Sequence, residues 1–149
     1  MSEGKKVEYR RDNCREKVKG LLKRAEEINT GKADYNYYNR IKEMILFGSL
    51  VNTNKDKVHD IDILVVWDSN CELRMKFHYE HPKIFKDMIY DYFSEWYLTK
   101  RYLKGGSKVF SIHSNVEESN GIFDIARSDK HIILMSDYKA LPENIDLIP

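Results

Sequence analysis

Two apolar runs, separated by a short polar stretch, constrain the fold of this 149-residue chain more than any other feature. The first, Met-Ile-Leu-Phe at residues 44–47, ends abruptly at Gly48-Ser49. The second begins at Asp60 as Asp-Ile-Asp-Ile and continues as Leu-Val-Val-Trp. Short apolar runs rich in β-branched residues and bounded by turn residues are typical of buried strands. We therefore expect two neighbouring strands, joined by a tight turn and the polar loop 52–59.

Helical periodicity flanks these strands. Apolar residues recur at spacings of three and four between Asn13 and Gly31, which predicts an amphipathic helix. Asp12 or Asn13 is expected to cap its start, and Gly31 lies just past its end. The stripe consists of Cys14, Val18, Leu21, Leu22, Ala25 and Ile28. The other expected elements are helices over roughly 34–42, 82–103 and 119–127 and strands over 108–113 and 132–135.

The length of the chain suits one domain. With 42% hydrophobic and 33% charged residues, its composition is typical of globular proteins. The order helix, strand, strand, helix, strand, short helix, strand predicts an α/β (α+β) fold, a small mixed β-sheet with helices over one face. Residues 1–149 are expected to form a single domain, with 1–12 as a flexible arm and 137–149 as an extended tail.

Charge and cysteine content exclude several classes of protein. A net charge of +1 argues against a protein that works mainly by coating nucleic acid. The chain has no run of 18 apolar residues, which argues against a membrane span, and no apolar signal core at its start, so a cytoplasmic location is expected. Its two cysteines, Cys14 and Cys71, are too far apart for a zinc knuckle.

The second apolar run carries the chemistry. Alternation along a strand places Asp60 and Asp62 on one face, about 6–7 Å apart. Two such carboxylates repel each other unless a cation lies between them, and divalent cations prefer hard oxygen ligands. Glycine at position 48 lets a phosphate approach the backbone, and the Ser49 hydroxyl with nearby N–H groups can hold phosphate oxygens. Lys55 and Lys57, in the connecting loop, are further candidates for phosphate contacts, or are ordinary exposed lysines.

This segment resembles the nucleotidyltransferase superfamily that includes DNA polymerase β. The family pattern is a hydrophobic residue followed by Gly-Gly or Gly-Ser, then nine to thirteen residues, then Asp-hydrophobic-Asp or Asp-hydrophobic-Glu. Here Gly48-Ser49 is followed by ten residues and then by Asp60-Ile61-Asp62. The short chain most resembles the minimal (MNT-type) members. The resemblance implies transfer of a nucleoside monophosphate from an NTP, with ATP expected, using Mg²⁺ or Mn²⁺ held by Asp60 and Asp62, with Gly48-Ser49 as the phosphate turn.

The chain departs from the family pattern at one position. Members of the family usually place a third carboxylate on the third strand, but no acid occurs in Val-Phe-Ser-Ile-His at residues 109–113. Ser111 and His113 would share a face there, and His113 is a candidate base or metal ligand. Asp124 is the other candidate ligand, if its surroundings form a strand rather than the expected helix.

Three functions remain open on this reading. The first is an active nucleotidyltransferase acting on a hydroxyl of a protein, a small molecule or RNA. The resemblance also implies a helical HEPN-type partner in a toxin–antitoxin pair, with AMPylation of a protein tyrosine as one form, or a homodimer, and no membrane. The second is a catalytically impaired nucleotide-binding or antitoxin-like protein that acts by binding a partner. The third is an interaction domain that uses its aromatic helix.

Overall fold

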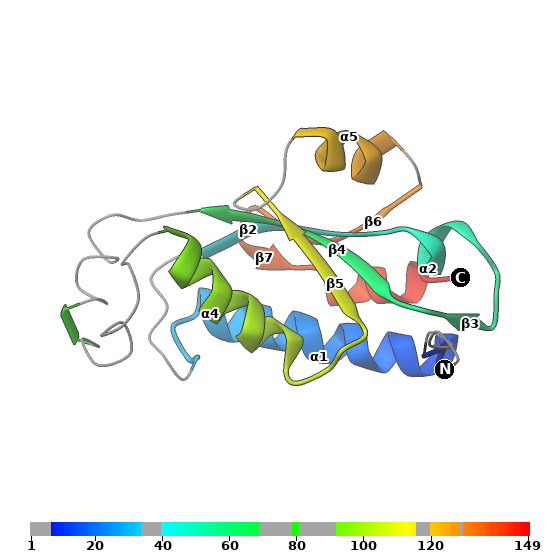
Figure 1. Cartoon of the computed structure of the whole chain (residues 1–149), viewed down its shortest axis with the longest axis horizontal. Coiled ribbons are helices and arrows are strands. Elements are labelled where there is room, and N and C mark those ends of the chain that lie inside the picture. The colour runs from blue at the N-terminus through cyan, green and yellow to red at the C-terminus, as the bar shows by residue number, and fades with distance from the viewer. Residues whose placement is uncertain (1–6, 34–39, 69–78, 81–91, 116–119, 129) are drawn as a thin grey trace, which may run out of the picture.

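The computed structural model describes residues 7–33, 40–68, 79–80, 92–115, 120–128 and 130–149. Within this part of the chain, a five-stranded sheet has the strand order β5-β4-β2-β6-β7 (Figure 1). Only the β4–β5 pair is parallel among these neighbours, so the sheet is mixed and the expected fold class is confirmed. The strands are β2 (Arg40–Phe47), β4 (Ile61–Asp68), β5 (Phe110–Ser114), β6 (Ile132–Ser136) and β7 (Lys139–Ala140).

Helices cover both faces of this sheet, so the expectation of one covered face was wrong. Figure 1 shows α1 (Arg11–Asn29) and α4 (Tyr92–Lys104) on one side and α5 (Asn120–Ser128) on the other. Met44 and Leu46 of β2 belong to the large core that contains the α1 stripe, whereas Ile45 and Phe47 pack with α5. The physical reason is that β2 is apolar on both faces, so both faces must be kept from water.

The first helix matches its predicted stripe, because all six of the apolar residues named above are buried. Its start differs from the prediction. Arg10 occupies the N-cap position with an extended backbone and makes no side-chain cap hydrogen bond, so Asp12 and Asn13 are not the cap. Gly31 follows the helix with φ at +74°, a left-handed conformation that glycine adopts readily.

Both ends of the chain pack more closely than the sequence suggested. Of the flexible arm expected over 1–12, residues 1–6 lie outside the described residues, whereas β1 (Tyr9–Arg10) pairs with β3 (Lys57–Val58), in the expected loop, and α1 begins at Arg11. In place of an extended tail, residues 137–149 contain β7 and the 3-10 helix η1 (Pro142–Leu147). Buried apolar groups lie at both places: Val58 of β3, and Ile145 and Ile148 near the end of the chain. That burial offsets the entropy lost on ordering them.

The remaining boundaries differ little from the predictions. A short helix, α2 (Ser49–Asn52), follows β2 directly, and the expected helix at 119–127 corresponds to α5. Of the helix expected over 82–103, residues 82–91 lie outside the described residues, and 92–103 are helical in α4. Of the helix expected over 34–42, residues 34–39 lie outside the described part, and 40–42 belong to β2.

Within the described residues, no helix has both the length and the apolar character that a membrane span needs.

A buried arginine joins the start of α1 to the segment after α2. The Arg11 guanidinium donates from Nε to the carbonyl of Lys55 (2.9 Å) and from Nη2 to that of Thr53 (2.8 Å). Its Nη1 donates to the carbonyls of Leu50 (2.5 Å) and Pro149 (3.2 Å). A charge is tolerated in this buried position because these carbonyls solvate it. Arg11 therefore holds the segment that follows Gly48-Ser49 against the first helix.

Replacing this residue, Arg11→Ala, should lower the free energy of unfolding by about 3 kcal/mol, because charged hydrogen bonds are lost and buried carbonyls lose their donor. Urea unfolding measures the effect. Arg15→Ala is the matched control: its side chain is 34% exposed and also donates to the carbonyls of Ile148 and Pro149. It should cost about 1 kcal/mol or less. Equal losses in the two variants would contradict the role given to Arg11.

Candidate active site

The site is organised around the turn between β2 and α2. Gly48 has φ at +79° and ψ at −156°, a backbone conformation that is nearly exclusive to glycine. A Cβ placed on Gly48 would lie 2.2 Å from Oδ2 of Asp62. The glycine is thus required twice, by its backbone angles and by the carboxylate packed against it. The structure therefore brings the predicted phosphate turn into direct contact with a predicted metal ligand.

Two side chains that the sequence reading did not single out fix this turn. Asn52 donates from Nδ2 to the carbonyl of Gly48 (3.0 Å) and to that of Lys130 (3.1 Å) just before β6. Thr53 donates from Oγ1 to the carbonyl of Ser49 (2.7 Å). Asn and Thr side chains often donate hydrogen bonds to nearby backbone carbonyls, so their position shortly after Gly-Ser could have predicted these two local bonds. The bond from Asn52 to Lys130 had no such signal, because it joins distant parts of the chain.

Sheet register places Asp62 between the ends of two other strands. On β4 it lies opposite Phe47 of β2 and Ser111 of β5. His113, two residues along β5 from Ser111, has its Nε2 4.0 Å from Oδ1 of Asp62. The Ser111 Oγ and the His113 Nε2 are 3.2 Å apart. The expectation that Ser111 and His113 share a face is met, and this face is the one that carries Asp62.

The carboxyl group of Asp62 is held in an unfavourable electrostatic environment. Its pKa is raised from 3.8 to about 6, first by burial and then by the negative charge of Asp60, while His113 acts in the opposite direction. Its side chain is 22% exposed, whereas Asp60 is exposed just before β4. A cation bound beside both carboxylates would remove this penalty. The carboxylate pair therefore fits a divalent cation.

No third carboxylate completes the pair within the described residues. Asp124 lies on α5, in a helix rather than a strand, and its side chain is exposed. The alternative in which Asp124 sits on a strand beside the other acids is therefore wrong. Among the residues that the structure describes, no group of three or more His, Cys, Asp or Glu is placed to hold a metal. Mg²⁺ nevertheless often uses one or two carboxylates together with substrate phosphates and water, so the two residues fit it.

The two candidate lysines lie beyond the turn. Both side chains are exposed. Lys57 belongs to β3, opposite Arg10, and the carbonyl of Lys55 accepts a hydrogen bond from Arg11. These contacts give both lysines a place in the β1–β3 region, and no described contact joins them to Asp62 or Gly48. Their predicted role in phosphate binding stays a prediction.

Comparison with known proteins agrees with this geometry. A family model described as a nucleotidyltransferase domain matches residues 14–109, more than half of the chain. The matched segment includes Gly48, Ser49, Asp60 and Asp62 and ends before β5, so His113 lies outside it. No curated protein and no solved structure matches the chain. On the strength of the family match, this chain belongs to the nucleotidyltransferase domain family.

Proposed function

We propose that this protein transfers a nucleoside monophosphate from an NTP, with ATP as the expected donor, to a hydroxyl group of an acceptor. The observation that carries the proposal is the contact between Gly48 and Asp62, where an added Cβ would overlap the carboxylate oxygen at 2.2 Å. A phosphate seated on the turn would lie next to the carboxylate pair. In a family of nucleotidyltransferase domains, that juxtaposition suits the α-phosphate of a bound NTP.

Asp60 and Asp62 would hold Mg²⁺ or Mn²⁺, which supplies charge stabilisation for the phosphate oxygens when bound. The Ser49 hydroxyl and the backbone N–H groups of the turn would orient the triphosphate. In the reaction, the acceptor oxygen attacks the α-phosphorus, the bond to the pyrophosphate group breaks and pyrophosphate leaves. The hydroxyl proton needs a base, and His113, whose Nε2 is 4.0 Å from Oδ1 of Asp62, is the candidate for that role.

A second candidate function follows from the residue that faces Asp62 on β5. Register places Ser111 there, and a serine supplies neither a carboxylate ligand nor a strong base. A chain with this substitution fits a nucleotide-binding protein that has lost catalysis and acts on a partner. The two candidates share NTP binding and differ only in transfer.

Incubating the protein with α-labelled NTPs, Mg²⁺ or Mn²⁺ and panels of RNA, protein and small-molecule acceptors tests the proposal. We expect labelled acceptor and released pyrophosphate, both lost when EDTA removes the metal. Thermal unfolding, run in parallel, should show stabilisation by Mg·ATP of about 2.7 kcal/mol at 100 times its Kd. Stabilisation without transfer would select the second candidate, and the absence of both would contradict the site.

A further inference from the structure

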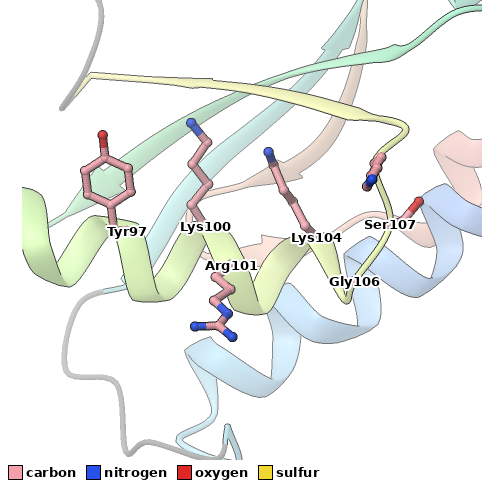
Figure 2. Close-up of a pocket in the computed structure, with 7 residues that line it drawn as sticks. Tyr97, Lys100, Arg101, Lys104, Gly106 and Ser107 are labelled. Carbon is pink, nitrogen blue, oxygen red and sulfur yellow. The ribbon is translucent and has the colours of Figure 1, made fainter. Parts of the chain in front are cut away.

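A groove of about 490 Å³ lies along α4 and the loop that leads from it toward β5. We call it the basic groove and define it by Tyr97, Lys100, Arg101, Lys104, Ser107 and Lys108. Figure 2 shows Tyr97, Lys100 and Lys104 extending from one side of α4, with Arg101 on another side. The basic groove runs along α4, which covers the face of the sheet opposite α5. Asp62 lies on the α5 face, so the groove and the candidate active site are on different sides of the sheet.

All charged residues among the described lining of the groove are basic. A fifth cation stands at the rim, because Lys17 of α1 donates from Nζ to Oγ of Ser107 (3.4 Å). Attraction between cations and the carbonyl end of a helix accounts for Arg101 and Lys104, which lie in the last turn of α4. Lys100, the residue before Arg101, and Lys108, beyond the helix, lie outside that last turn. The near-neutral net charge of the whole chain conceals this local concentration of positive charge.

The turn after α4 brings these charges together. Gly105 and Gly106 have φ at +56° and +80°, and the N–H of Ser107 donates to the carbonyl of Lys104 (3.0 Å). Glycine adopts these left-handed conformations without the steric cost that other residues incur. The chain therefore reverses within a few residues and returns Lys108 to the same groove as Lys100.

The shape and chemistry of the groove point to one class of ligand. Tyr97, Lys100 and Lys104 follow the spacing i, i+3, i+7, which places them in a row about 10 Å long on one face of α4. The Tyr97 side chain is 58% exposed beside these cations. Aromatic rings next to a line of cations are the means by which proteins bind single-stranded nucleic acid, with bases stacked and phosphates neutralised.

We infer that the basic groove binds single-stranded nucleic acid, with phosphates on Lys100, Lys104 and Lys108 and a base stacked on Tyr97. The inference goes beyond nucleotidyl transfer, since it requires no chemistry at Asp62. It also differs from binding a double helix, because paired bases offer no free ring face to Tyr97. Either RNA or DNA supplies the required phosphates and bases, and the experiment below separates them.

Fluorescence anisotropy with 5′-labelled U₁₂ and dT₁₂, from 50 to 300 mM salt, tests the inference. For three lysine–phosphate contacts, the slope of log K against log salt should be about −2. The double variant Lys100→Gln/Lys104→Gln should reduce this slope by about 1.4 and weaken binding of both oligonucleotides. Tyr97→Ala should weaken binding about tenfold while leaving the slope unchanged, and Tyr97→Phe should restore it. A preference for U₁₂ or dT₁₂ identifies the natural ligand as RNA or DNA.

Two controls make the test specific. Lys32→Gln/Lys139→Gln removes the same charge from exposed positions outside the groove lining and should leave the slope unchanged. Asp62→Asn should keep full binding, so a failure of catalysis would not be mistaken for a failure of the groove. Absence of binding to both oligonucleotides, equal losses in the two lysine double variants, or tighter binding of duplex than of U₁₂ and dT₁₂ would each overturn the inference.

Discussion

Asp62→Asn should reduce nucleotidyl transfer by about 1000-fold, because the amide cannot replace a charged metal ligand beside the phosphate turn. The same change should stabilise the protein when EDTA keeps it free of metal. Asp62 is half-buried near Asp60 and lies against Gly48, and under the proposed function its negative charge serves a bound cation rather than the fold. A residue that lowers stability and raises activity is typical of an active site. Label transfer and urea unfolding, measured on one preparation, check both effects.

The raised pKa of Asp62 determines how its carboxyl group changes the stability of the protein with pH. The folded-state pKa of Asp62, about 6, lies above its ordinary value of 3.8. The folded state therefore holds this proton more tightly than the unfolded chain does. Its stabilising contribution is fully present below about pH 4 and is lost as the pH rises through 6. At pH 8 the lost contribution approaches 3 kcal/mol, because each pKa unit corresponds to about 1.4 kcal/mol.

Urea unfolding in EDTA should thus show Asp62→Asn gaining about 2–3 kcal/mol over the wild type at pH 8 and little at pH 4. The control is Asp146→Asn, an exposed aspartate on η1, which should leave the difference between the two pH values unchanged. Adding Mg²⁺ should stabilise the wild type and not Asp62→Asn. A variant that is less stable than the wild type at pH 8 would contradict the electrostatic account of the site.

Gly48→Ala should abolish ATP binding and lower the free energy of unfolding by about 3 kcal/mol or more. The new methyl group meets the carboxylate of Asp62 at 2.2 Å, and the backbone angles at this position disfavour any side chain. Either the turn or the carboxylate must move. Either change separates the proposed phosphate-binding backbone from the proposed metal ligand. Isothermal titration with Mg·ATP measures the loss of binding.

Gly106→Ala is the matched control for this prediction. Gly106 has nearly the same φ, +80°, but an added Cβ would meet no atom within 4 Å. It should cost about 1 kcal/mol for the backbone conformation alone and leave ATP binding intact. Equal costs in the two variants would show that the contact with Asp62 carries no energy. Retained ATP binding by Gly48→Ala would contradict the placement of the phosphate turn.

Most of the site's framework was predictable from local sequence. The run that ends at Phe47 and the alternation around Asp62 are features of a few consecutive residues, and strand geometry turns them into a turn and a shared face. The same run also indicates how many faces of its strand are covered. Ile45 and Met44 are both apolar, which signals a strand covered on both sides, and the structure places α5 over the second side.

Other parts of the site had no local signal. Ser111 faces Asp62 because of the register in which β5 pairs with β4. No residue pattern between positions 62 and 111 predicts that register. Arg11 reads as one more charge in a basic N-terminal segment, yet its partners Leu50 and Lys55 lie 39 and 44 residues further along the chain. The expectation of a flexible arm was wrong at this residue, because a buried charge is stable when carbonyl groups packed around it accept its hydrogen bonds.

The sequence by itself determined the family, the two central strands and the pair of aspartates, because each rests on spacing within a short segment. Only the tertiary structure decided that Gly48 touches Asp62, that His113 stands beside that carboxylate, and that Lys100 and Lys108 line one groove. The physical reason is the range of the forces involved. Backbone propensity and periodicity act over a few residues, whereas register, burial and charge clustering depend on segments brought together by the packed core.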